Sequence, residues 1–212
     1  MTVSSRLLRR AFPLPAAALG ASFLIVLLCT AQTPAVQRAA PAAAQGKLGN
    51  MDWPVYRGDQ KGNQFVALAQ INATNVHKLK PAWEYHTGDA SERSTMYANP
   101  LIVNGVMYIS TPSLKAVALD AATGARLWEF DPAAYNNGTV IRLRNRGVTY
   151  WKGAEGERIF DFVGDRVYGL DAKSGKLIQT FGSDGHIDLR QNLGVDAAGV
   201  TLEMTTPLGS MS

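Results

Sequence analysis

The sequence predicts an all-β fold, a partial β-propeller built from repeated four-stranded sheets. Residues 118–130 return as residues 169–181, 51 positions later, with Leu, Asp, Ala, Gly and Phe in register. Upstream of each copy lie short β-rich runs separated by turn residues, without a helical period. Units of about 40–50 residues with four short antiparallel strands are typical of propeller blades, each of which buries its apolar face against a neighbour. These observations together favour this architecture over other all-β folds.

The first repeat supplies the clearest strand signals. Asn104-Gly105 stands between two β-rich runs and is the strongest short-range signal for a hairpin. Residues 120–124 form the next expected turn, because Asp120 can bond its own backbone and Gly124 tolerates a positive φ. The four expected strands cover residues 101–103, 106–110, 116–119 and 126–130.

The second repeat follows the same pattern. Its expected strands include residues 159–163, 166–170 and 177–181, with residues 171–175 as the matching turn. Closed propellers need at least about four blades, so we expect the chain to be the N-terminal part of a longer protein. The expected segments are a leader and linker at 1–45, a propeller opening segment at 46–95, blades at 96–145 and 146–195, and the start of a further blade at 196–212.

The leader differs in charge from the rest of the chain. The chain has 21 Lys and Arg against 17 Asp and Glu, and the first fifty residues hold five of the basic residues and no acid. The remaining 162 residues therefore hold 16 basic and 17 acidic side chains, a net charge of −1. A nearly neutral body lacks the basic surface that phosphate binding requires, so no nucleic acid is expected as a partner.

The N-terminal 31 residues have the form of an export signal. Arginines precede an uncharged stretch from Ala11 to Ala31, and small residues around Ala31 and Ala44 suit cleavage. The stretch is also long enough to remain as a membrane anchor, and Cys29 offers a site for lipidation. We therefore expect a periplasmic protein, either released or anchored to the inner membrane. Cys29 is the single cysteine, so the exported part can form no internal disulfide.

Most catalytic signatures are absent from the sequence. It contains neither the Gly-x-Ser-x-Gly nucleophile elbow nor the His-Glu-x-x-His zinc motif. His77, His86 and His186 lack metal-ligand spacing and are interpreted as surface or loop residues. Asp120 and Asp171 occupy the same turn in both repeats, so turn capping is a better interpretation than catalysis.

Ala118, Asp120, Thr123, Gly124 and Trp128 form the pattern Ala-x-Asp-x-x-Thr-Gly-x-x-x-Trp. This pattern resembles the tryptophan-docking motif of the quinoprotein dehydrogenases, eight-bladed propellers that use pyrroloquinoline quinone (PQQ). The resemblance implies that the motif tryptophan stacks on the next blade and is structural, which suits the large apolar face of an indole. Further stretches resemble the same family, in order, at residues 52–59, 71–89, 145–151 and 182–189.

The resemblance assigns one residue to the cofactor. In the family, the arginine of the stretch at residues 145–151 reaches a PQQ carboxylate, and that position is Arg146. A guanidinium matches a carboxylate with two parallel hydrogen bonds. Tyr97 stands where the family often places a cofactor-contacting Glu or Gln. Many family members carry two adjacent cysteines a few residues before this arginine, but residues 140–144 contain none. The resemblance therefore implies the glucose dehydrogenase-like branch, which lacks this pair, rather than the methanol and ethanol dehydrogenases.

The resemblance implies a periplasmic PQQ-dependent dehydrogenase that oxidises a sugar or alcohol, polarises its cofactor with Ca²⁺ and passes electrons to ubiquinone or a cytochrome. The metal ligands and catalytic Asp are expected beyond residue 212, so the chain alone is expected to be inactive. Two alternatives remain open: a non-enzymatic PQQ-like-repeat scaffold of the outer-membrane assembly lipoprotein type, and an unrelated sugar-binding or lactonase propeller. The alternative interpretation of Arg146 is that it pairs with an acid of a neighbouring blade.

Overall fold

The computed structural model describes residues 52–59, 61–66, 68–92, 94–141, 143–193, 202 and 204–207. These residues form eight strands and two short 3-10 helices, η1 (Val76–Lys78) and η2 (Pro132–Tyr135). Within this part of the chain, no helix is long and apolar enough to cross a lipid bilayer. The predicted leader at 1–45, Cys29 included, lies outside the described residues, as does most of the predicted segment at 196–212.

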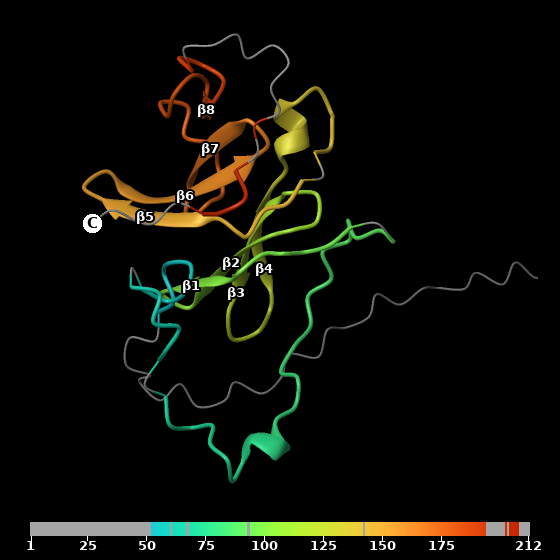
Figure 1. Ribbon diagram of the computed structural model, residues 1–212, viewed down its shortest axis with the longest axis vertical. Coiled ribbons are helices and arrows are strands. Elements are labelled where there is room, and N and C mark those ends of the chain that lie inside the picture. The colour runs from blue at the N-terminus through green and yellow to red at the C-terminus, as the bar shows by residue number, and fades with distance from the viewer. Residues whose placement is uncertain are drawn as a thin grey trace, which may run out of the picture. The chain divides into compact units, whose positions relative to one another are not determined.

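The first sheet comprises β1 (Leu101–Val103), β2 (Val106–Ser110), β3 (Ala116–Asp120) and β4 (Arg126–Phe130), antiparallel and in chain order (Figure 1). Asn104 and Gly105 join β1 to β2 with φ angles of 50° and 78°. Two successive residues in the left-handed region are what a type I′ hairpin turn requires. These strands lie where the sequence predicts them, and β3 extends one residue further.

The second sheet comprises β5 (Thr149–Gly153), β6 (Gly156–Val163), β7 (Arg166–Asp171) and β8 (His186–Asp188), again antiparallel and in chain order. β6 and β7 contain two of the predicted strands. The repeated phrase does not identify β5, which lies upstream of it and pairs with β6 as β1 pairs with β2.

The predicted strand at residues 177–181 is wrong. Only Leu177 forms a bridge to the neighbouring strand. The backbone then turns, because the amide of Phe181 donates to the carbonyl three residues earlier at 2.9 Å. Gly182 and Gly185, at φ 62° and 83°, bring the chain back toward β7, so that β8 becomes the fourth strand of the sheet.

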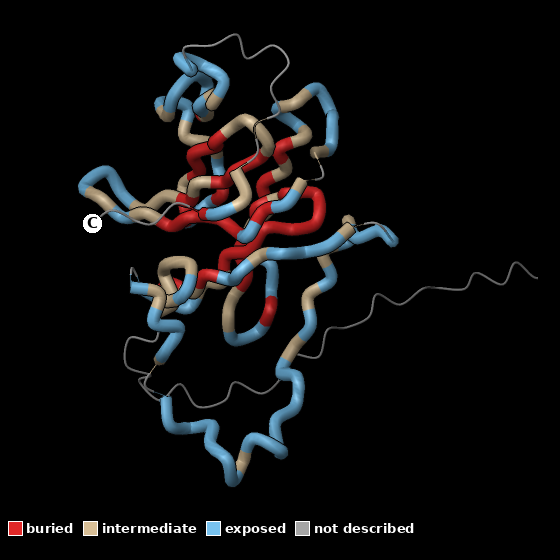
Figure 2. Tube along the Cα trace, viewed as in Figure 1, coloured by how far each residue is buried: buried red, intermediate tan, exposed pale blue. Residues whose placement is uncertain are grey.

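One apolar cluster joins the two sheets. Side chains alternate between the two faces of a strand, so every second residue of a strand points to the same side. Figure 2 shows the buried segments (red) within the two sheets, whereas most of the opening segment is exposed (pale blue). The cluster between the sheets includes Leu101, Tyr108, Ala116, Ala118, Ile159, Tyr168 and Leu170.

The other face of the first sheet holds a second, smaller cluster. Ile109, Val117 and Leu119 are buried there and pack against Trp83 and Tyr85 of the opening segment. The first sheet is therefore covered on both faces. These contacts fix Trp83 and Tyr85 of the opening segment against the first sheet, whose first strand begins at Leu101.

Candidate functional site

Trp128 of β4 packs on a turn of the second sheet. Its indole nitrogen donates a hydrogen bond to the backbone carbonyl of Ala172 at 3.0 Å. The ring lies over Gly175, where an added Cβ would come within 2.5 Å of an indole carbon. Gly175 also has a φ of 68°, a conformation that favours glycine. The indole thus joins neighbouring sheets through both its polar nitrogen and its apolar face.

Trp83 makes the same junction one unit earlier. Its indole nitrogen donates to the carbonyl of Ala121 at 3.2 Å, and an added Cβ on Gly124 would come within 2.5 Å of the ring. The sequence motifs place Trp83 in the opening segment but do not predict that its indole packs on a turn of the first sheet. The signal that could have identified it is the triplet Trp83-Glu84-Tyr85, which parallels Trp128-Glu129-Phe130.

The carboxylates of Asp120 and Asp171 bond the backbone of their own turns. Asp120 accepts from the hydroxyl and the amide of Thr123, both at 2.8 Å. Asp171 accepts in the same way from the amide of Ser174 at 2.8 Å and from its hydroxyl at 2.5 Å. The hydrogen bonds from Thr123 lower the pKa of Asp120 below its ordinary value. This carboxylate is therefore ionised, and it is hydrogen-bonded within its own turn.

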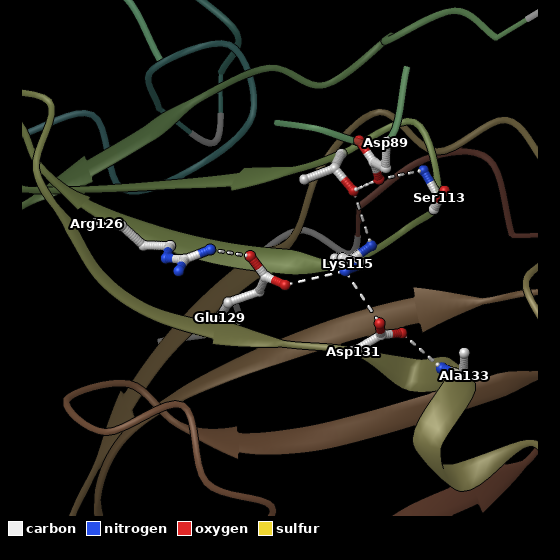
Figure 3. A network of polar contacts seen from close by, with 8 residues as sticks. Asp89, Ser113, Lys115, Arg126, Glu129, Asp131 and Ala133 are labelled. Carbon is white, nitrogen blue, oxygen red and sulfur yellow. Dashed lines mark hydrogen bonds and ion pairs between the residues drawn. The ribbon is translucent and has the colours of Figure 1, made fainter. Parts of the chain in front are cut away.

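A polar network ties the opening segment to the first sheet (Figure 3). Asp89 accepts from the hydroxyl of Thr111 at 2.5 Å and from a backbone amide of the same loop at 3.0 Å. Burial acts to raise the pKa of Asp89, but its hydrogen bonds outweigh burial, so the pKa is lowered. Lys115, in the same loop, pairs with Glu129 and Asp131 at 3.0 Å each. Because these charged groups have partners, the network is structural.

Arg146, the residue predicted to contact the cofactor, lies shortly before β5 with an exposed side chain. Its carbonyl accepts from the amide of Asn99 at 2.8 Å, which links the entry of β5 to the entry of β1. The buried carboxamide of Asn145 accepts from the amide two residues later at 2.6 Å and donates to the carbonyl of Phe162 at 2.9 Å. The backbone of Arg146 is therefore held on both sides. Its guanidinium donates to the carbonyl of Thr205 at 3.1 Å.

Arg146 lines a cavity of about 560 Å³ together with the opening segment. Arg57 and Lys61 line the same cavity, so three cations face it. Asp59, the carboxylate in its described lining, accepts from the amide of Asn63 at 3.0 Å and from its side chain at 2.5 Å. These hydrogen bonds lower the pKa of Asp59. Such a cavity suits an anionic ligand. The other lining residues are Tyr56, Gly62 and Thr206.

The other predicted candidates lie apart from this cavity. Tyr97 is exposed and does not line it. His77 and His86 are exposed, and His186 lies on β8 against the ring of Tyr168. Among the described residues, no three His, Cys, Asp or Glu side chains gather as metal ligands.

Asp161 is a buried ionisable group that the sequence motifs do not predict. Its side chain in β6 is fully buried, and neither of its carboxylate oxygens has a hydrogen-bond partner in the described part of the chain. Burial raises the pKa of Asp161 to about 8, and the adjacent backbone of Phe162 offsets this only in part. The available signal is the alternation along β6, where Asp161 stands between the core residues Ile159 and Val163.

The sequence matches a family described as glucose/ethanol/alcohol dehydrogenase, beta-propeller domain (PQQ), over residues 53–210. It is 35% identical over 173 residues to a quinoprotein glucose dehydrogenase of Escherichia coli (strain K12), an alignment that covers 73% of this chain and 22% of that protein. It is 42% identical over 131 residues to the dehydrogenase subunit of an alcohol dehydrogenase (quinone) of Gluconobacter oxydans (strain 621H), covering 60% of this chain and 16% of that subunit.

The chain is also similar in structure to a solved dehydrogenase. The quinohemoprotein alcohol dehydrogenase from Comamonas testosteroni aligns with a TM-score of 0.51 and 32% sequence identity, covering 66% of this chain and 20% of that chain. The predicted fold class, a partial all-β propeller, is confirmed by the family match and this similarity. The chain spans about a fifth of the length of these relatives.

Proposed function

The chain belongs to the glucose/ethanol/alcohol dehydrogenase β-propeller family, and from this membership we propose that it is the N-terminal part of a PQQ-dependent dehydrogenase. The protein would oxidise the hydroxyl group of a sugar or an alcohol. The relatives are named dehydrogenases of glucose or alcohol, which favours this function over a non-enzymatic scaffold. The single observation that carries the proposal within this chain is the position of Arg146 in a cationic cavity.

The residues of this cavity fit PQQ, a planar quinone that carries several carboxylate groups. Arg146 would hold one carboxylate through its guanidinium, which keeps its charge at any physiological pH and presents paired donors. Asn99 and Asn145 fix the backbone from which this side chain extends. When bound, PQQ supplies the quinone that is reduced as the substrate hydroxyl is oxidised, and the protein supplies binding, orientation and electrostatics.

The remaining parts of the function are proposed from the family alone. We propose Ca²⁺ as the metal, held by residues outside this chain, and ubiquinone or a cytochrome as the electron acceptor. The basic, then apolar leader supports an exported, periplasmic protein that either keeps or loses an attachment to the inner membrane. The absence of adjacent cysteines in residues 140–144 supports a glucose dehydrogenase-like substrate range.

The test uses the protein expressed from its complete reading frame, reconstituted with PQQ and Ca²⁺. We expect oxidation of glucose or of a simple alcohol, followed by reduction of an artificial dye. Arg146→Gln should raise the PQQ concentration for half-saturation roughly 10- to 100-fold, the range for a lost charged hydrogen bond. Lys152→Gln, in β5 and paired with Glu157 of β6, is the control and should leave PQQ binding unchanged. A protein that binds no PQQ and oxidises none of these substrates would support the scaffold alternative instead.

A further inference from the structure

Beyond Arg146, we propose that Arg57 and Lys61 of the opening segment complete one anion site, and that this chain by itself binds a planar polycarboxylate there. The identification of the natural ligand as PQQ rests on the proposed function. The existence of the site does not, because it follows from three cations and one cavity. The resemblance to the quinoprotein dehydrogenases assigns only Arg146 to the cofactor.

The opening segment and Arg146 are both attached to β1 and the residues just before it. Trp53 exchanges two backbone hydrogen bonds with Ile102 of β1, at 2.7 and 3.0 Å, so the segment runs along the free edge of the first sheet. Asp52 accepts from a backbone amide in the β1–β2 turn at 2.9 Å. The entry of β1 in turn holds the carbonyl of Arg146 through Asn99. β1 therefore anchors both sides of the cavity.

The loop that carries the two additional cations is folded tightly against this anchor. An added Cβ on Gly58 would come within 2.9 Å of the Trp53 ring, so the loop lies directly on the indole. Arg57 has a φ of 69°, which is unfavourable for a residue with a long side chain. Strained backbone of this kind is concentrated at functional sites, where the surrounding structure maintains it. The guanidinium of Arg57 lies 5.4 Å from the centre of the Tyr56 ring.

The charges in the cavity are not balanced. Within the described part of the chain, no carboxylate forms an ion pair with Arg57, Lys61 or Arg146. Asp59 is the acid in the described lining, and both of its oxygens accept hydrogen bonds from Asn63. With the ionised Asp59, the described lining carries three positive charges and one negative charge, a net charge of +2, and a bound anion with more than one negative group would balance it.

The class of ligand follows from the lining. Two guanidinium groups and an ammonium group favour carboxylates over neutral groups, and arginine pairs with carboxylates in a planar, bidentate manner. Tyr56 adds an aromatic ring to the wall of the cavity, which favours a flat, conjugated ligand over a flexible one. The volume of about 560 Å³ lies within the range of small-molecule sites, about 300–1,000 Å³.

The test measures the binding of PQQ to the 212-residue chain by isothermal titration calorimetry. Citrate, a non-planar polycarboxylate, is titrated separately. We expect PQQ to bind more tightly than citrate, and both affinities to fall as salt rises. Arg57→Gln and Lys61→Gln should each weaken PQQ binding about tenfold or more. Both side chains are exposed, so these variants should keep the unfolding transition of the parent chain. Lys152→Gln is the matched control and should bind as the parent does.

The outcomes separate this inference from the proposed function. If Arg146→Gln loses binding while Arg57→Gln and Lys61→Gln bind normally, the opening segment contributes nothing and this inference is overturned. It is also overturned if the chain binds neither PQQ nor citrate, whether or not the complete protein binds PQQ and is active. If the three variants all weaken binding but the complete protein oxidises no alcohol or sugar, the anion site stands and the proposed function fails.

Discussion

The two sheets share one strand order but are stabilised differently at their outer strands. Trp83 of the opening segment packs on the turn at residues 120–124 of the first sheet. Trp128 of the first sheet packs in the same way on the turn at residues 171–175 of the second sheet. The second sheet has the same glycine turn, but Gln179, an exposed residue, stands where Trp128 stands in the repeat. A junction therefore consists of two separable halves, an indole from one unit and an Asp-to-Gly turn from the next. Among the described residues, the second sheet supplies the receiving turn but no tryptophan at the position equivalent to Trp128.

The two sheets also differ in how they accommodate a carboxylate, which is half-buried in Asp89 and fully buried in Asp161. Asp89 packs against the first sheet and receives hydrogen bonds from Thr111 and a backbone amide, which lower its pKa. Asp161 lies within the second sheet without a partner among the described residues, and burial raises its pKa to about 8. The half-buried carboxylate that accepts hydrogen bonds is therefore charged at neutral pH, whereas the fully buried carboxylate without such partners is mostly protonated.

The largest expected effect is that of Asp161→Asn. Because the pKa of Asp161 rises from 3.8 to about 8 on folding, the folded state keeps a proton between these values that the unfolded state releases. Stability therefore falls as pH rises from about 4 to 8, by about 1.4 kcal/mol per pH unit. Since Asn does not ionise, we expect the variant to gain on the order of 4 kcal/mol at pH 7 and little at pH 4. Urea unfolding at several pH values measures this difference.

Asp89→Asn is the control for this prediction and should show the opposite sign. The lowered pKa of Asp89 means that its contribution is present at neutral pH and is lost as pH falls through the folded-state pKa. We expect Asp89→Asn to destabilise the chain at pH 7 and to approach the parent in acid. A gain from Asp161→Asn that did not change with pH would show that Asp161 is not protonated in the folded chain.

Trp128→Ala should have the next largest effect. The substitution removes a half-buried indole from the junction and leaves the turn at residues 171–175 without its cover. We expect a loss of about 3 kcal/mol in the free energy of unfolding, at the low end for large-to-small changes because the ring is only partly buried. Leu127→Ala is the neighbouring control, since Leu127 is 53% exposed. Equal losses in the two variants would contradict a structural role for the indole.

The first sheet could be predicted from the sequence because its signals are local. Asn104-Gly105 and the turn at residues 120–124 specify where the chain reverses, and the β-rich runs on either side of these turns pair with each other in the sheet. The strand predicted at residues 177–181 is wrong because the similarity between the two repeats weakens over this segment. Gln179 replaces the tryptophan that would keep this segment extended beside its neighbour, and two glycines then reverse the chain.

The candidate cavity could be predicted only in part. Arg146 was identified by resemblance, whereas Arg57 and Lys61 are roughly ninety residues upstream of it and carry no pattern that links them to it. Their convergence depends on the backbone pairing of Trp53 with Ile102, which no local signal specifies. Asp161 was missed because a charged residue in a β-rich run is ordinarily placed on the exposed face.

Gly175→Ala tests the receiving half of the junction. An added methyl group would meet the Trp128 ring and would also occupy a left-handed backbone position. We expect a loss of about 2–3 kcal/mol, from the conformational penalty together with displacement of the indole. Gly105→Ala is a matched control, because its φ of 78° is similar but nothing lies within 4 Å of the added carbon. It should lose only about 1 kcal/mol, and equal losses would mean that the ring does not pack on the turn.

The smallest expected effect compares the two turn carboxylates. Asp120→Ala and Asp171→Ala each remove an acceptor that binds the amide and hydroxyl of the residue three positions later. We expect each to lower the free energy of unfolding by about 1 kcal/mol, measured with urea, because the turns are exposed and water can replace part of the lost bonding. The two losses should agree, although only one turn is followed by a tryptophan. Each turn also receives an indole, Trp83 on the first and Trp128 on the second. A clearly larger loss at Asp120, whose turn is followed by Trp128, would mean that this turn also positions the indole that leaves it, and that the two halves of the junction are coupled.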